Sequence, residues 1–269
     1  MLSEKTRNCR HKNALLMPRL LVLTSLAMGL LAGDSFAQDP FVIAPNAYKI
    51  KFENDWVRVV RVHYGPFEKI GPHDHPQGQT IFIYLNDSGE VRFQHVEGFS
   101  GHYPAIRPPT KAGAFRLARV QPENHEVENL SNIPSDFLQV ELKTQEVDPD
   151  SFRGRSLPEA PSAQQPADYR KIEFDNAQVR ITRLVCKSRV ECSAAEVTSG
   201  ALLVALSPLK FRSETSGKSP SRQSLNMGET SWLAPGSRAW TSGSIEHPAE
   251  QLLIEFKSKP VKTGAGDKH

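Results

Sequence analysis

The chain contains an internal repeat of domain length, and this repeat constrains the fold more than any other feature of the sequence. The first copy opens at Tyr48 with the segment YKIKFE, and the second opens at Tyr169 with YRKIEF. Each copy continues into a Val-Arg-x-x-Arg core, which begins at Val57 and at Val179. The sequence therefore predicts two small domains of the same fold rather than one large domain.

The repeat also sets the domain boundaries that we expect. The copies span residues 46–145 and 169–257, and the segment 146–168 between them is rich in Pro, Gln and Ser. This composition is typical of a linker. Residues 258–269 are polar and contain glycine, so they are expected to form a disordered tail.

The pattern inside each copy favours an all-β fold. Residues 57–64 and 80–85 are short runs rich in Val, Ile, Phe and Tyr, and turn residues such as 86–89 (Asn-Asp-Ser-Gly) separate such runs. Short β-rich segments between turn signals are typical of a small sandwich or barrel. No stretch after the first 37 residues has a helical period over a dozen residues.

The first 37 residues have the pattern of a secretory signal peptide. Residues 1–19 hold five basic side chains against one acidic one, residues 20–33 are apolar and uncharged, and Ser35 and Ala37 form a small-x-small site. This order predicts cleavage after Ala37 and a periplasmic or secreted protein, with Met1 or Met17 as the start. A membrane anchor is the alternative, although a span usually needs about 20 apolar residues.

Removal of this segment leaves a chain with almost no net charge. The full chain has a net charge of +3, and residues 1–37 hold five basic and two acidic side chains, which is also +3. A balanced chain argues against nucleic acid, which needs a concentrated basic face. No membrane association is expected after cleavage; the expected partner is a small molecule, and a homo-oligomer remains open.

Two cysteines remain after the signal peptide, which carries Cys9, is removed. Cys186 and Cys192 are close in sequence. In an oxidising compartment an even number of cysteines permits a disulfide. Two free buried thiols are the alternative.

Histidines in the first copy are spaced like metal ligands. His73 and His75 are two residues apart, so on a strand their side chains point to the same face. Gln79 can return to that face after the turn at 76–78, and His125 follows fifty residues beyond His75. Imidazole suits iron, manganese, nickel, copper and zinc. The spacing therefore predicts a site for one divalent transition metal.

These residues resemble the two motifs of the cupin superfamily. His73, His75 and His125 match its three histidines, Asn129 matches the asparagine that closes its second motif, and Gln79 takes the place of its glutamate. The resemblance covers both copies and implies two tandem cupin barrels (a bicupin of the double-stranded β-helix, or jelly-roll, type). It implies a metal inside the mouth of the first barrel, held by His73, His75, Gln79 and His125.

The glutamine is a departure from the family pattern. Neutral ligands leave the ion its full double charge, so the ion should favour a small anionic or bidentate ligand from outside. In charge the site is similar to those of three-histidine cupins such as thiol dioxygenases.

The second copy is expected to be degenerate. Laying the copies together places Ala194, Ala195 and Val197 where the first two histidines lie, and Ala201 at or near Gln79. Trp240 falls at the position of His125, so its indole is expected to fill the interior of the second barrel. Apolar residues cannot bind an ion, so only the first barrel should hold a metal.

Two functions of different classes follow. The resemblance implies a metal-dependent, dioxygenase-like enzyme, an oxygenase or isomerase that acts on a small molecule outside the cytoplasm. The alternative is a non-catalytic bicupin that binds a small molecule or has a structural role, without a functional metal. The sequence nominates no catalytic residue, because one fold hosts many functions.

Overall fold

The computed structural model describes residues 39–75, 78–95, 104–120, 123–152, 155–156 and 168–261. The predicted signal peptide and the tail after residue 261 lie outside these ranges. The all-β prediction is confirmed, since 58% of the residues are in strands and 4% in helices. Within the described ranges, no helix combines the length and the apolar character that a membrane span requires.

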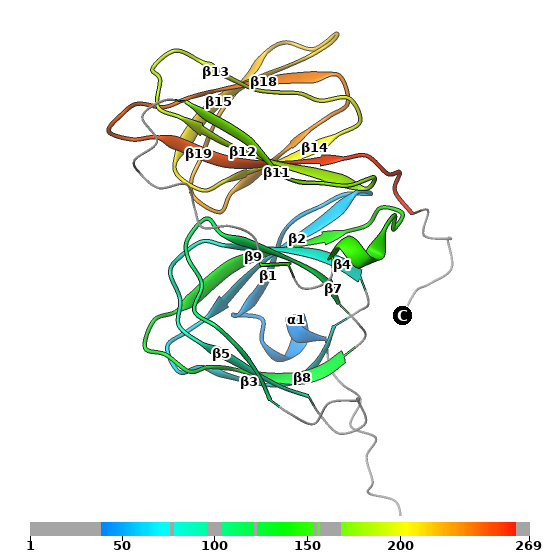
Figure 1. Ribbon diagram of the computed structural model, residues 1–269, viewed down its shortest axis with the longest axis vertical. Coiled ribbons are helices and arrows are strands. Elements are labelled where there is room, and N and C mark those ends of the chain that lie inside the picture. Colours follow the sequence, from blue (N-terminus) through cyan, green and yellow to red (C-terminus); the bar gives the residue numbers. More distant parts are fainter. Residues whose placement is uncertain are drawn as a thin grey trace, which may run out of the picture. The chain divides into compact units, whose positions relative to one another are not determined.

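The first repeat folds into two antiparallel sheets that face each other. Its larger sheet has the order β1-β2-β9-β4-β7-β10 and its smaller sheet the order β3-β8-β5-β6 (Figure 1). The elements are α1 (Pro40–Ile43), β1 (Tyr48–Glu53), β2 (Val57–Tyr64), β3 (Lys69–His75), β4 (Gly78–Tyr84), β5 (Val91–His95), β6 (Ala105–Arg107), β7 (Phe115–Val120), β8 (Glu123–Asn129) and β9 (Ser135–Leu142).

The second repeat has the same topology. Its sheets have the orders β11-β12-β19-β14-β17 and β13-β18-β15-β16, which match the first repeat strand for strand except for the added edge strand β10. Even the register shift in the first strand recurs, at Ile50/Phe52 and at Ile172/Phe174. The strands are β11 (Tyr169–Asp175), β12 (Val179–Cys186), β13 (Cys192–Glu196), β14 (Ala201–Ala205), β15 (Leu209–Thr215), β16 (Ser221–Leu225), β17 (Thr230–Leu233), β18 (Ser237–Ser242) and β19 (Ala249–Phe256).

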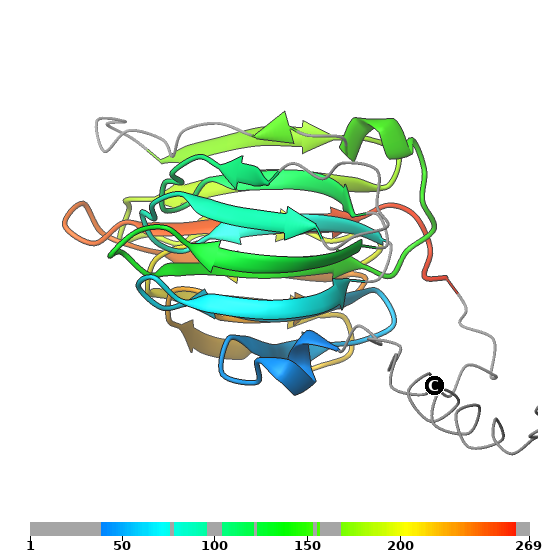
Figure 2. The ribbon, with the colours of Figure 1, turned by 90° about the horizontal axis from the view of Figure 1, so that it is seen from below.

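The segment between the repeats adds two short elements, a 3-10 turn (η1, Pro149–Phe152) and the strand β10 (Arg155–Ser156). β10 pairs with β7 and extends the larger sheet of the first repeat. Figure 2 shows the strands running side by side, with helix α1 (blue) outside them. At the end of the described residues, Val261 donates its backbone N–H to the carbonyl of Lys143, which directly follows β9 of the first repeat.

Each larger sheet buries apolar side chains on both faces. One face packs inside its own barrel, with Val60 and Val62 in the first and Leu203 in the second. The other faces share a single core cluster, to which both repeats contribute Val59, Ile83, Leu117, Ile181, Leu202 and Ile254. A strand that is buried on both faces reads as a continuous apolar run, which explains why β14 has the sequence ALLVA.

Trp240 does not lie where the sequence comparison placed it. On β18 its neighbours Ala239 and Thr241 are fully buried, so Trp240 points to the opposite, outer face. There the guanidinium carbon of Arg212 lies 4.0 Å from the centre of its ring. The expectation that the indole fills the barrel was wrong, because a shift of one residue in a strand turns a side chain to the other face.

The rest of the second interior agrees with a degenerate site. Val197 and Ala201 are buried in its apolar cluster, whereas the side chains of Ala194 and Ala195 lie outside the described part. In the described part of this repeat, one group has three donor side chains close enough for a metal: Asp168, Cys186 and Cys192. Its two sulfur atoms are bonded to each other, so they do not offer thiolate ligands.

The predicted disulfide is confirmed. Cys186 ends β12 and Cys192 begins β13, with their Cα atoms 6.0 Å apart. We expect the Cys192→Ala variant to lose about 2 kcal/mol of unfolding free energy, because the bridge restricts the unfolded chain only over a short loop. Urea denaturation measures this loss. Dithiothreitol should lower the wild-type midpoint and leave the variant unchanged; equal wild-type midpoints with and without reductant would contradict the prediction.

Candidate metal centre

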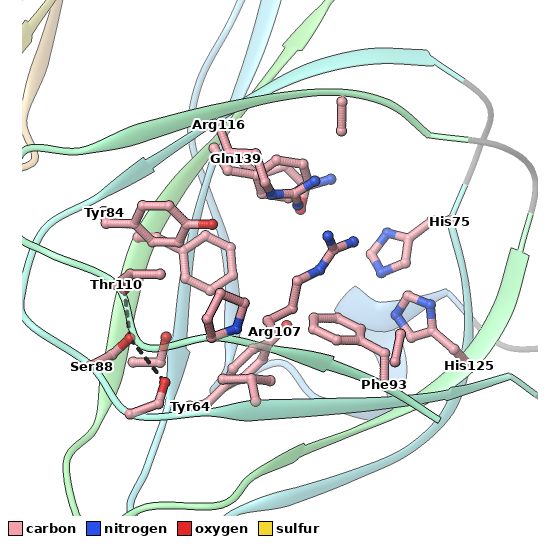
Figure 3. Close-up of a pocket in the computed structure, with 18 of the residues that line it drawn as sticks. Tyr64, His75, Tyr84, Ser88, Phe93, Arg107, Thr110, Arg116, His125 and Gln139 are labelled. Carbon is pink, nitrogen blue, oxygen red and sulfur yellow. Dashed lines mark hydrogen bonds between the residues drawn. The ribbon is translucent and has the colours of Figure 1, made fainter. Parts of the chain in front are cut away.

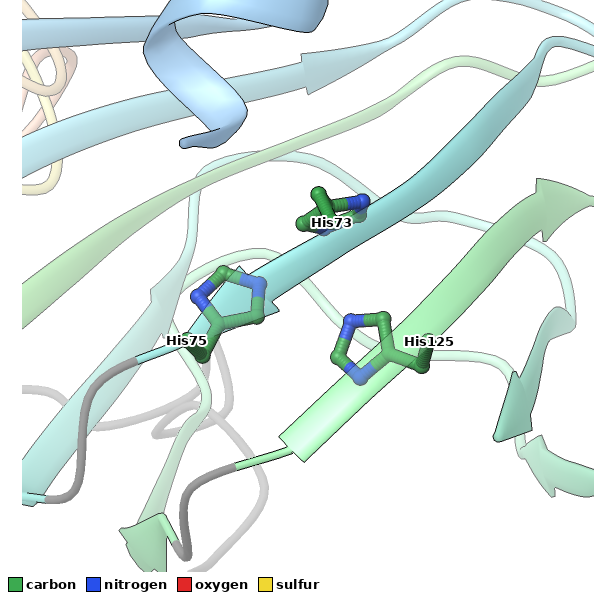
Figure 4. A group of neighbouring side chains, drawn as sticks. All are labelled: His73, His75 and His125. Atoms are coloured by element: carbon green, nitrogen blue, oxygen red, sulfur yellow. The ribbon is translucent and has the colours of Figure 1, made fainter. Parts of the chain in front are cut away.

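The three histidines lie on two paired strands of the smaller sheet. His73 and His75 are on β3, His125 is on β8, and His73 lies directly opposite His125 in the ladder. A register shift between Ile70 and His73 precedes the pair. Figure 4 shows the three rings on the same side of these strands. The strand alternation expected from the sequence therefore brings all three imidazoles together.

Their geometry fits a metal ligand set. One ring nitrogen from each histidine lies within 4.8 Å of those from the other two. Metal–nitrogen distances of about 2.1 Å require nitrogens about 3–3.5 Å apart, so small side-chain rotations would close the set. His73 is 0% and His125 is 3% exposed, and His75 is partly buried. These donors fit a transition metal better than a hard cation, which prefers oxygen.

Hydrogen bonds fix the orientation of His73. Its Nδ1 lies 2.9 Å from the carbonyl oxygen of Gly71. A carbonyl only accepts, so Nδ1 carries the proton and Nε2 of the neutral ring has the lone pair. The hydroxyl of Tyr48 lies 3.1 Å from Nε2 and 2.8 Å from the hydroxyl of Tyr64. A metal on Nε2 therefore requires the Tyr48 hydroxyl to move away from this nitrogen, and the Tyr64 hydroxyl is within reach to accept its proton.

The two tyrosines remain neutral hydrogen-bonding groups. Burial is the main cause that raises the pKa of Tyr48 well above its ordinary value, and the neighbouring Tyr64 adds to the rise. Burial also raises the pKa of Tyr64. Both shifts favour the neutral phenol.

Gln79 lies apart from the histidine strands. It is on β4, which belongs to the larger sheet, and it is 1% exposed. It lines a separate cavity together with Arg58 and Glu141. Its amide oxygen and nitrogen have no hydrogen-bond partner among the described residues. Its place as a fourth ligand stays a prediction.

Asn129, the other residue that matches a family motif, has a structural role. Its amide nitrogen donates to the carbonyl oxygens of Gly65 and Ile133, each at 2.8 Å. Its amide oxygen accepts from the backbone and the hydroxyl of Ser131. Asn129 therefore holds the turn that follows β8 and does not face the imidazoles as a donor.

A cavity of about 230 Å³ lies beside the imidazoles, inside the first barrel. His75 and His125 are on one wall (Figure 3), and aromatic side chains and Arg116 are on the others. None of its described lining residues is an aspartate or glutamate. The sequence reasoning missed Tyr48, Tyr64 and Arg116, because no sequence pattern marks them as part of the histidine site and only the fold brings them near.

His95 was also missed as a member of this wall. It lies opposite His125 on β5, and the centres of the two rings are 6.0 Å apart. It lines the same cavity as His75 and His125. The sequence spacing between His75 and His95 did not indicate a shared cavity wall, because His95 belongs to a different strand.

Solved structures match the chain over both repeats. AerE from Microcystis aeruginosa is 14% identical with a TM-score of 0.52, and the match covers 78% of this chain and 97% of that one. Vicilin from Corylus avellana (hazelnut) is 9% identical with a TM-score of 0.52, covering 79% and 84%. The 7S globulin of Momordica charantia is 9% identical with a TM-score of 0.53, covering 80% and 83%.

No family model and no curated protein matches the sequence. At such low identities the structural matches describe the fold alone. They cover most of this chain, so the likeness extends to both repeats and to the way in which they follow one another.

Proposed function

We propose, from the premise that the chain has the tandem cupin fold, that its first barrel binds one divalent transition metal and acts on a small anionic or bidentate molecule. The observation that carries this proposal is the convergence of His73, His75 and His125 beside a cavity. Gln79 completes or tunes this ligand set. When bound, such an ion would polarise an oxygen group of the ligand or activate dioxygen, which is oxygenase or isomerase chemistry.

The residues of the chain prepare the site in three ways. The Gly71 carbonyl holds His73 in the tautomer that presents Nε2 to the ion. Tyr48 and Tyr64 form a buried hydroxyl pair that can rotate a proton away from His73 and toward a ligand. Aromatic side chains form part of the cavity wall and give a ligand an apolar surface to pack against.

The second candidate is a non-catalytic bicupin that binds a small molecule without a functional metal. It is favoured by the contact of Tyr48 with the Nε2 of His73, the position at which an ion would bind. The two candidates differ in one measurable property, which is the metal content of the purified protein.

Metal analysis of the mature protein is the deciding experiment. We expect about one redox-active ion per chain by inductively coupled plasma mass spectrometry, and metal-dependent oxygen uptake or isomerisation with a substrate of the predicted class. A protein that stays metal-free after reconstitution with iron, manganese, nickel, copper and zinc would favour the second candidate.

The proposal also includes export of the protein from the cytoplasm. It is supported by the basic and apolar pattern of residues 1–37 and by the Cys186–Cys192 bridge, since disulfides persist mainly outside the cytoplasm. Mature protein recovered from its host should begin near Gln38. Extracellular material with an intact Met1 or Met17 terminus would contradict export by this signal.

A further inference from the structure

We propose that the cavity beside the histidines binds a small carboxylate with a single aromatic ring, and that Arg116 binds its carboxylate group. This inference deepens the proposed function and rests on it for the role of the first barrel as the functional one. Two observations carry it. Arg116 lies in the cavity wall without a carboxylate partner, and the wall around it is free of carboxylates and rich in aromatic rings among its described residues.

Arg116 is a half-buried cation with an unused donor. It lies directly opposite Phe82 in the ladder between β7 and β4, and its guanidinium carbon is 4.2 Å from the centre of the Phe82 ring. The stacking holds the planar group in place. Its buried Nε has no hydrogen-bond partner among the described residues. A buried donor without a partner costs stability. The same guanidinium lies in the cavity wall, where its terminal nitrogens can donate to an anionic ligand.

The cavity wall has no negative charge to neutralise this cation. Besides Arg116, its described lining includes Arg107 and Arg119 but no carboxylate. Arg119 is already paired with Glu146, at 3.3 Å. A lining of one sign raises the local concentration of oppositely charged ligands. Arg116 is therefore placed to receive an anion, and Arg107, whose guanidinium carbon lies 5.4 Å from the centre of the Phe93 ring, is in the same cavity wall.

A carboxylate suits the neighbours of Arg116 better than a neutral group does. Gln139 lies opposite Phe82 on the other side of β4, so Arg116, Phe82 and Gln139 form one row across three strands. Figure 3 shows Arg116 and Gln139 side by side in the cavity wall. The amide nitrogen of Gln139 donates one hydrogen to Glu141, at 3.2 Å. Its second hydrogen remains for a ligand oxygen. The planar fork of Arg116 matches the two oxygens of a carboxylate.

The remaining walls fit one aromatic ring. They are formed by Phe82, Phe93, Phe137 and Tyr84, and aromatic rings pack well against each other edge to face or offset. The volume of about 230 Å³ is below the range of about 300–1,000 Å³ that is usual for ligand pockets, so the cavity suits a small ligand. Such a ligand would lie between the Arg116 row and the histidine wall.

Direct binding tests this inference. Benzoate and phenylacetate are titrated into the full mature protein by isothermal titration calorimetry, with benzamide and phenylacetamide as neutral counterparts and acetate as the ligand without a ring. Each titration is done with metal-free and with zinc-loaded protein. We expect the better aromatic carboxylate to bind at least about 10-fold more tightly than its amide, in line with hydrogen bonds to charged groups. Acetate, which has no ring, should bind more weakly than either aromatic carboxylate.

Variants locate the interaction. Arg116→Gln should weaken binding of the carboxylate at least about 10-fold and leave the amide unchanged, and Arg116→Lys should give an intermediate loss because it keeps the charge but not the fork. Arg119→Gln removes the same charge from an arginine that is already paired, and it should change the affinity less than about 3-fold. Thermal unfolding checks that each variant is folded.

The inference is overturned if neither carboxylate binds better than its amide, or if Arg119→Gln weakens binding as much as Arg116→Gln. If Arg116→Gln does not fold, Arg116→Lys and the wild-type comparison of acid with amide decide. Metal content is measured in the same samples. A protein that prefers the carboxylate to its amide but never takes up metal would support this inference and overturn the proposed function. A protein that takes up metal but binds the carboxylate no better than its amide would support the proposed function and overturn this inference.

Discussion

Replacing His75 with alanine is expected to abolish stoichiometric metal binding by the mature protein. His75 supplies one of only three imidazoles in the described cluster, and a two-ligand remnant cannot retain an ion against water and buffer. The affinity should fall by more than about 100-fold, since the outer partners of metal ligands are alone worth about 10–100-fold. Metal content after dialysis, and competition with a chelator of known affinity, measure the loss.

A matched histidine provides the control. His63 is exposed on β2, and it is not a member of the cluster of three. His63→Ala should keep the wild-type metal content and affinity. Retention of a full complement of metal by His75→Ala would show that the ion binds elsewhere, and equal losses in both variants would indicate nonspecific binding.

Replacing Arg183 with methionine should destabilise the protein by about 3–5 kcal/mol, because it removes one partner of a buried ion pair. The Arg183 side chain is 0% exposed, and its Nε lies 2.9 Å from Glu173, whose side chain is 2% exposed. Arg183 also pairs with Glu250, at 2.5 Å, and donates to the carbonyl of Gly113 in the first repeat, at 2.6 Å. Without the arginine, Glu173 is left as a buried charge.

Equilibrium unfolding in urea measures this effect, and Arg180→Met is its control. Arg180 is three residues earlier on the same strand and pairs with Asp175 at the surface, where an ion pair is worth less than about 1 kcal/mol. The double variant Arg183→Met/Glu173→Gln should recover part of the loss, since it removes the unpaired charge. An Arg183→Met variant as stable as Arg180→Met would contradict the structural role of the buried pair.

The repeat and the strand alternation predicted two all-β domains and the group of three histidines, and the resemblance to the cupin motifs predicted the type of barrel. Alternation works at His73 and His75 because side chains on a strand repeat with period two, whatever surrounds the strand. The same rule explains the error at Trp240, where an alignment displaced by one residue reversed the face. Residues such as Tyr48 and Arg116 could not be predicted as part of the site, because non-local pairing alone brings them to the cavity. The role of Gln79 as a fourth metal ligand stays a prediction.

The two Val-Arg-x-x-Arg cores have a consequence for how the repeats recognise each other. Arg183 of the second repeat binds the turn at Gly113 of the first. In the reverse direction, Nη1 of Arg61 lies 3.5 Å from the point where a Cβ on Gly228 would be, in the turn before β17. Both glycines have positive φ, 77° and 80°. Equivalent arginines thus approach equivalent turns, which is the isologous pattern of a homodimer with twofold symmetry.

The chain can therefore be regarded as a covalently linked dimer of its own two halves. The face that an isolated barrel would offer to another copy is already covered, so a homo-oligomer of the whole chain must use a different surface. The second half can lose its ligands and still be retained by selection, because its partner depends on it for burial of the shared apolar face.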